Sequence, residues 1–195
     1  MVEVPKKRAL IQTVPSISFR DNWWNLLLIA ALLGALLSTL FWFLNFVHLF
    51  SSILWTGTDI FMGFVLGPVM RRVDFAARRA VLMRLMPRML FYMPTVATVS
   101  ITSGYYLAKG LGLFGLSFPA LYWVIAALVV SAILTVQGLA MLLPTNLRVY
   151  FEMRKEEPDP KKIQRLMGFY IKVVASQGLM QLAVVIIMTR FRAGI

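Results

Sequence analysis

The sequence WWNLLLIAALLGALLSTLFWFLNFVHLFSSILWTGTDIFMGFVLGPVM fills residues 23–70 and carries one formal charge, at Asp59. A straight helix of this length would extend for about 72 Å. Because the hydrocarbon core of a bilayer is roughly 30 Å thick, the stretch predicts two membrane-spanning helices joined by a tight reversal. We place them at about residues 23–41 and 44–70, with the turn near residues 43–45. Alternatively, the first segment lies at the membrane interface or re-enters the membrane.

The composition extends this prediction to the whole chain of 195 residues, of which 59% are hydrophobic and 14% charged. A soluble domain has roughly 25% charged residues, and one of this size could not bury so many apolar side chains. Further apolar runs predict spans at about residues 89–108, 119–143 and 167–189. We expect Pro87 and Pro94 to kink the third span and Pro144 to end the fourth. No internal repeat is evident.

The sequence therefore predicts an all-α transmembrane helix bundle of about five spans, a four-span core with an extra N-terminal span. Residues 1–22 form a cytoplasmic N-terminal segment, and residues 23–195 form one domain with cytoplasmic loops at about 71–88 and 145–165. With five spans and an inside N-terminus, 17 of the 20 Lys and Arg residues fall on the cytoplasmic side, as the positive-inside rule requires. This predicts a multi-pass protein of a prokaryotic plasma membrane with its C-terminus outside.

The basic residues that give the net charge of +12 lie mainly in the short segments between apolar runs, so we do not expect nucleic acid as a partner. Asp74 is spaced to pair with Arg78 one helical turn later. Dense arginine beside a membrane attracts anionic lipid, and an acidic partner subunit is the alternative. The arginines expected to bind one or both are Arg71, Arg72, Arg78, Arg79, Arg84 and Arg88.

Polar residues within the apolar runs are candidates for function. A carboxylate at bilayer depth costs at least about 2.5 kcal/mol, so Asp59 is a candidate for proton or small-solute translocation. His48, the only histidine, lies on nearly the same helix face about 16 Å away along the axis. It is either a haem or copper ligand or a residue hydrogen-bonded to a neighbouring helix. Gln137, Gln177 and Gln181 are interpreted as interhelical hydrogen-bonding groups, with a polar substrate channel as the alternative.

Catalytic motifs are missing from the sequence. It contains no cysteine, and we find no nucleophile–base pair, phosphate-binding glycine loop, HExxH or GxSxG. We therefore expect a non-catalytic subunit of a larger membrane assembly, of respiratory or other redox type, with lipids and other membrane subunits as partners. A cofactor held by this chain alone is not expected, since one histidine cannot provide bis-histidine haem ligation; haem b or copper on His48 is the alternative.

A family resemblance supports this view. The segment LNFVHLFSSILWTGTDIFMGFVLGPVMRR, residues 44–72, is similar to the first helix of CopD-like and DUF2269-type prokaryotic membrane proteins. The tail from Pro144 to Phe191 also resembles the DUF2269-type tail, and the first span lies outside the resemblance. CopD-like relatives are associated with copper uptake, which implies His48 as a possible ligand. Their further His and Met ligands have no clear counterparts here.

Overall fold

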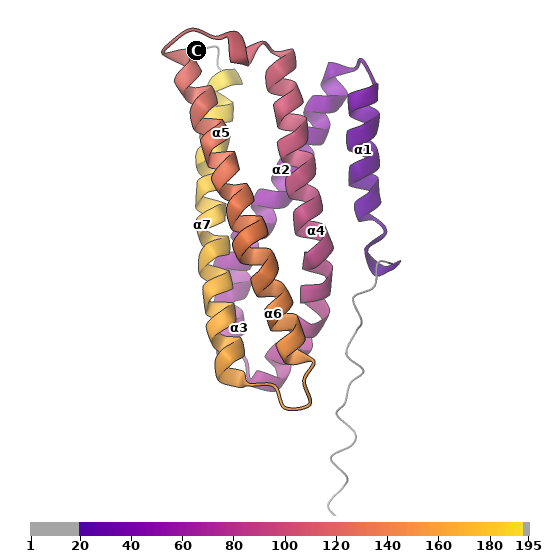
Figure 1. The fold of residues 1–195 in the computed structure, drawn as a ribbon, viewed down its shortest axis with the longest axis vertical. Helices are drawn as coiled ribbons and strands as arrows, with labels where there is room; N and C mark the ends of the chain where they lie inside the picture. The colour runs from indigo at the N-terminus through magenta and orange to yellow at the C-terminus, as the bar shows by residue number, and fades with distance from the viewer. Residues whose placement is uncertain (1–19, 193–195) are drawn as a thin grey trace, which may run out of the picture.

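The computed structural model describes residues 20–192, and within this range the chain is helical with no strand. The helices join end to end into five long helical segments, called rods below, which alternate in direction (Figure 1). Their bounds are as follows: 3-10 helix η2 (Arg20–Asn22) and α1 (Asn25–Leu37); α2 (Phe41–Ile60), π-helix η3 (Phe61–Leu66) and α3 (Gly67–Arg72); α4 (Phe75–Gly110) and 3-10 helix η4 (Leu113–Gly115); α5 (Ala120–Val136), π-helix η5 (Gln137–Leu142) and α6 (Leu143–Met153); and α7 (Pro160–Arg192). The predicted all-α fold class is confirmed.

Three rods are long and apolar enough to cross a membrane, those at Phe41–Arg72, Ala120–Met153 and Pro160–Phe191. Large apolar side chains cover their outer surfaces, for example Trp42, Tyr122 and Ile186, each more than 60% exposed. Exposed apolar surface of this extent needs a lipid environment. The chain is therefore a multi-pass helical membrane protein in contact with lipid.

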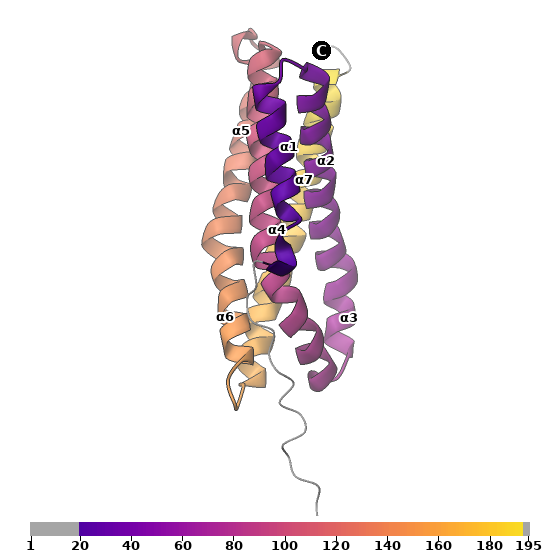
Figure 2. The ribbon, with the colours of Figure 1, turned by 90° about the vertical axis from the view of Figure 1, so that its right-hand side faces the viewer.

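The first of the five predicted spans is not confirmed, and the alternative of an interfacial or re-entrant segment stays open. Helix α1 has 13 residues, about 20 Å, which is too short to cross the hydrocarbon core alone. It lies along α2 and α4 (Figure 2) and packs on them through a cluster that includes Leu32, Ala35 and Val99.

The turn after α1 was predicted at the wrong place. The chain reverses at residues 38–40, where Ser38 and Leu40 are extended and the Ser38 hydroxyl donates to the Ala35 carbonyl. Serine hydroxyls compete in this way with the helical backbone. The predicted turn at residues 43–45 lies inside α2, where apolar packing outweighs the low helix propensity of Asn45.

The predicted stop at Pro144 is also wrong, because η5 carries the helix through it. Proline cannot donate to the carbonyl four residues back and its ring clashes there. In η5 the Leu143 N–H donates to the Gly138 carbonyl, five residues back, and this wider turn places Pro144 in the first turn of α6. Within η3, Gly67 donates to Met62 in the same manner, and Pro68 follows.

The segments around Pro68 and Pro144 share a local pattern. Each proline stands two residues after a π-helix and shares four flanking residue types with the other. The matching pairs are Leu66 and Leu142, Arg72 and Arg148, Val73 and Val149, and Phe75 and Phe151. Both segments end at the same end of the bundle, which also holds the starts of α4 and α7 (Figure 1). We call it the arginine-rich end.

The two predicted cytoplasmic loops are mostly helix. Helix α4 begins at Phe75 and runs through Pro87 and Pro94 to Gly110, so the predicted loop at 71–88 shrinks to the turn around Val73 and Asp74. The predicted loop at 145–165 shrinks to residues 154–159 between α6 and α7. The N-terminal segment of residues 1–22 lies mostly outside the described residues, which include only its last three positions.

Candidate functional site

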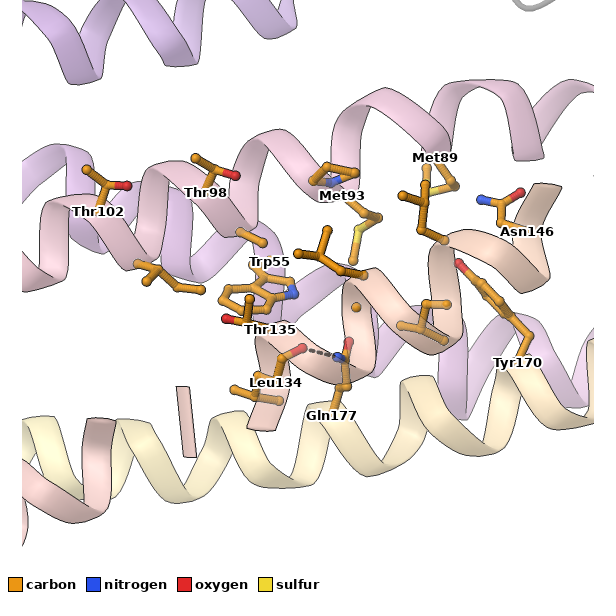
Figure 3. Close-up of a pocket in the computed structure, with 17 residues that line it drawn as sticks. Trp55, Met89, Met93, Thr98, Thr102, Leu134, Thr135, Asn146, Tyr170 and Gln177 are labelled. Atoms are coloured by element: carbon orange, nitrogen blue, oxygen red, sulfur yellow. Dashed lines mark hydrogen bonds between the residues drawn. The ribbon is translucent and has the colours of Figure 1, made fainter. Parts of the chain in front are cut away.

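A cavity of about 230 Å³ lies between α4 on one side and α5, η5 and α6 on the other, and Trp55 of α2 and two residues of α7 also line it (Figure 3). It exists because α4 and α5 barely contact each other, whereas α4 packs closely on α2 and also on α6. Apolar residues form most of the wall, among them Met89 and Met93. Small and hydroxyl residues form a second part of it: Ala97, Thr98, Thr102, Thr135 and Gly138.

Three larger polar side chains reach the same cavity. Gln177 of α7 is 1% exposed, and its Nε2 donates to the Leu134 carbonyl at 2.9 Å. Asn146 of α6 is 4% exposed, and its Oδ1 has no hydrogen-bond partner among residues 20–192. Tyr170 of α7 lines the cavity close to Asn146 (Figure 3). The cavity therefore presents neutral hydrogen-bonding groups within an apolar wall.

Of the predicted polar candidates, only Gln177 lines this cavity. Gln137 is the first residue of η5 but does not line it, and its Oε1 is buried without a partner within the described range. Gln181 lies on α7 and bonds to α2 instead. The sequence pattern did not single out Asn146 or Tyr170, since both lie beside the polar end of a helix, where such residues are common.

Asp59 is fully buried between α2 and α7. Its Oδ2 accepts a hydrogen bond of 2.8 Å from Gln181 Nε2, while Oδ1 has no hydrogen-bond partner in the described range. Gly63, one turn later, allows the close approach of α7, because a Cβ there would lie 3.0 Å from the Ala175 Cα. Asp59 does not line the cavity beside Trp55.

His48 belongs to a polar seam between α2 and α4. Its Nδ1 lies 2.9 Å from the Ser100 carbonyl oxygen, and Ser52 Oγ lies 2.7 Å from Ser100 Oγ. The imidazole packs on Gly104, where a Cβ would lie 2.7 Å from its Cε1. His48 therefore bonds to α4, whereas Asp59 bonds to α7, although both lie on nearly the same face of α2. His48 thus makes the hydrogen bond to a neighbouring helix that one of its two interpretations expects.

The geometry also fixes the proton on His48. A carbonyl oxygen only accepts, so Nδ1 carries the hydrogen, and neutral imidazole then keeps a lone pair on Nε2. Metal-bound histidines commonly have this arrangement, with the second ring nitrogen donating to a carbonyl. However, within residues 20–192 no three His, Cys, Asp or Glu residues gather to hold a metal ion. His48 can supply one ligand, and copper would need several more.

The arginine-rich end is organised by backbone contacts. Asp74 caps α4 by accepting from the Ala77 N–H at 2.9 Å, so it does not form the predicted pair with Arg78. Arg78 instead donates to the carbonyls of Arg71 and Val73 at the end of α3. Arg79 donates to the Met153 carbonyl at 2.9 Å, which links α4 to the end of α6.

The only carboxylate of the described residues with ion-pair partners is Glu152, in the last turn of α6 beside the loop at 154–159. Lys162 and Lys155 bond to it at 2.7 Å and 2.9 Å. These hydrogen bonds, first from Lys162 and then from Lys155, lower the pKa of Glu152 to about 2. None of the six arginines named above has a carboxylate partner within residues 20–192, so their charge remains available to ligands.

No protein-family model, no curated protein and no solved structure matches this chain. The fold and the composition define a multi-pass helical membrane protein. The resemblance to CopD-like and DUF2269-type proteins stays a prediction.

Proposed function

We propose that this chain is a non-catalytic subunit of a larger membrane assembly, with a transmembrane helix of another subunit seated over the cavity between α4 and α5. The observation that carries the proposal is the composition of this cavity together with the unpartnered Oδ1 of Asn146. On the side of the bundle where α4 and α5 diverge, side chains of another protein would fill the cavity.

The wall chemistry favours a helix as that group. Helix–helix interfaces in membranes are rich in small and hydroxyl residues, which let backbones approach and hydrogen-bond across the contact. Ala97, Thr98, Thr102, Thr135 and Gly138 are such residues, and a Cβ at Gly138 would meet only Gln177 Nε2, at 4.0 Å.

The size of the cavity agrees with this choice. At about 230 Å³ it is smaller than small-molecule pockets, which are typically about 300–1,000 Å³. It has room for a few side chains that project from a neighbouring helix. A polar side chain among them would bond to Asn146 Oδ1. Membrane redox assemblies are the first class to search for this partner, in keeping with the resemblance to CopD-like proteins.

Site-specific photo-crosslinking in native membranes tests the proposal. A photoreactive amino acid replaces Leu139, which lines the cavity and is 57% exposed, or Leu49 on α2, which is 56% exposed and lies away from it. We expect a discrete crosslinked protein band from Leu139 and none from Leu49. If Leu139 crosslinks only to lipid, and the protein purifies from mild detergent as a lone chain, the proposal is wrong.

A second candidate function, supported by the lone pair on His48 Nε2, is that of a haem-binding subunit that shares the axial ligands with another chain. Haem b would be held on one side by His48, with the Ser100 carbonyl fixing the ring orientation. Absorption spectra of the protein purified in its native assembly test this, with His48→Ala as the variant. A Soret band that survives in the variant, or no band in the native assembly, removes this candidate.

Translocation through Asp59 is the third candidate, supported by its buried and only half-satisfied carboxylate. Asp59→Asn keeps an oxygen that can accept from Gln181 but removes the ionisable group. In reconstituted vesicles we then expect proton or solute flux to stop while the protein stays folded. Flux that continues unchanged would reduce Asp59 to an interhelical bonding group.

A further inference from the structure

A second cavity, of about 320 Å³, lies at the arginine-rich end between the end of α3, the first half of α4 and α7. We infer that it binds the phosphate headgroup of an anionic membrane lipid through Arg71, Arg78 and Lys172. The inference does not depend on the proposed partner helix, which lies over a different cavity.

The charge of the lining is the first argument. Three of its nine residues are cationic, Gln164 is neutral and polar, and none is acidic. The nearest acid in the sequence, Asp74, uses its Oδ1 to cap α4. Among residues 20–192 no ion pair neutralises the positive charge of this cavity, and an anion would supply the missing charge.

The second argument is that Arg78 is held in position for a ligand. Its Nη2 donates to the carbonyls of Arg71 and Val73, at 3.3 Å and 3.1 Å, which fixes the guanidinium against the end of α3. Its Nε is buried and has no hydrogen-bond partner among residues 20–192. A buried donor without a partner costs about 1–3 kcal/mol, and a phosphate oxygen in the cavity would satisfy it.

The shape of the cavity is the third argument. Gln164, Gly168 and Lys172 are spaced four residues apart, so they form one stripe along α7. A Cβ at Gly168 would meet nothing within 4 Å, which leaves the middle of the stripe open.

Apolar residues continue the same wall, namely Met70, Leu82, Met167 and Ile171. A site with cations beside apolar side chains at the end of a membrane bundle fits a lipid, whose phosphate meets the cations while its acyl chains follow the apolar wall. Free inorganic phosphate has the same oxygen chemistry but would make no use of this wall.

The test is native mass spectrometry of the full chain in detergent with added dioleoylphosphatidylglycerol, using dioleoylphosphatidylcholine as the neutral lipid. The site variant is Arg71→Gln with Lys172→Gln. The control variant is Arg148→Gln with Arg165→Gln, which removes the same charge from the same end of the bundle at two exposed residues outside the cavity. We expect the site variant to bind phosphatidylglycerol about 20- to 30-fold more weakly, and the control variant to change affinity less than about threefold.

A third variant, Gly168→Leu, projects an apolar side chain into the cavity without changing charge, from a position where a Cβ would meet nothing within 4 Å. We expect it to lose phosphatidylglycerol binding as the site variant does. Equal losses in the site and control variants, or full binding by Gly168→Leu, would overturn the inference in favour of diffuse surface attraction. If millimolar inorganic phosphate displaces the lipid, the site binds phosphate as inferred, but the inference that its ligand is a lipid is wrong.

Discussion

Replacing Gly104 with alanine places a methyl group against the His48 ring, 2.7 Å from its Cε1 and 3.1 Å from its Nδ1. The ring must move, and it then loses its 2.9 Å hydrogen bond to the Ser100 carbonyl. Overpacking of this kind costs about 1–3 kcal/mol, and an interhelical hydrogen bond in a membrane protein contributes about 0.6 kcal/mol. Alanine recovers about 0.5–1 kcal/mol of helix propensity. We therefore expect a net destabilisation of about 0.6–3 kcal/mol.

Gly57 provides the matched control. It lies inside α2, and a Cβ there would meet nothing within 4 Å. Gly57→Ala should therefore be neutral or stabilise by up to about 1 kcal/mol. Unfolding of the purified chain in mixed micelles, titrated with sodium dodecyl sulfate and followed by circular dichroism, measures both variants.

A double-mutant cycle identifies the cause. In a His48→Ala background the methyl group of Gly104→Ala loses its three nearest contacts, which are all to the imidazole. Its penalty should therefore disappear, and the coupling energy reports the contact between the two residues. If Gly104→Ala is no less stable than Gly57→Ala, or keeps its full penalty without the imidazole, then the α2–α4 seam is not packed as described.

Three further changes test other contacts. Asp74→Ala removes the cap of α4 and should destabilise the chain by about 0.5–2 kcal/mol. If Asp74 instead acted through an ion pair with Arg78, the loss of stability would depend on salt. A destabilisation that 0.5 M NaCl abolishes would therefore contradict the capping role. Gly63→Ala sets a Cβ 3.0 Å from the Ala175 Cα, and because backbone cannot move aside as a side chain can, unfolding titrations should show a loss of about 1–3 kcal/mol. For Glu152, whose pKa is lowered to about 2, the stabilisation is complete above its ordinary value of about 4.3 and is lost as pH falls through about 2. The difference in melting temperature between wild type and Glu152→Gln should thus stay constant above about pH 5 and fall towards zero between pH 5 and 2. A difference independent of pH would contradict the lowered pKa of Glu152.

The residues that determine lipid exposure could be recognised from the sequence, because hydropathy over twenty residues sums many small transfer energies of one sign. The all-α class, the apolar helical segments after Phe41 and the segregation of arginine at one end follow from that sum. The features that were not predicted depend on competition between local hydrogen bonds and helix formation. At Ser38 a hydroxyl outweighed helix propensity, and at Pro144 a change in hydrogen-bond register removed a clash that normally ends a helix.

The candidate site was only partly predictable for a related reason. Gln177 stood out because an amide is rare in an apolar run. Asn146 did not, because it follows Pro144 in a segment that reads as a polar loop until η5 extends the helix through it. Likewise, a sequence gives no sign that Asp59 would bond to Gln181, more than a hundred residues later, since that pairing depends on how α2 and α7 cross.

The π-helix η5 also sets the rotation of everything that follows it. Each residue of an α-helix turns the chain by about 100°, so deleting one residue from the Gln137–Leu142 segment would restore α-helical spacing and swing α6 round by about that angle. Val149 and Tyr150, both fully enclosed, would then face outward, and Asn146 would leave the cavity. The extra residue of this π-helix therefore fixes the rotation of α6 about the helix axis relative to α5.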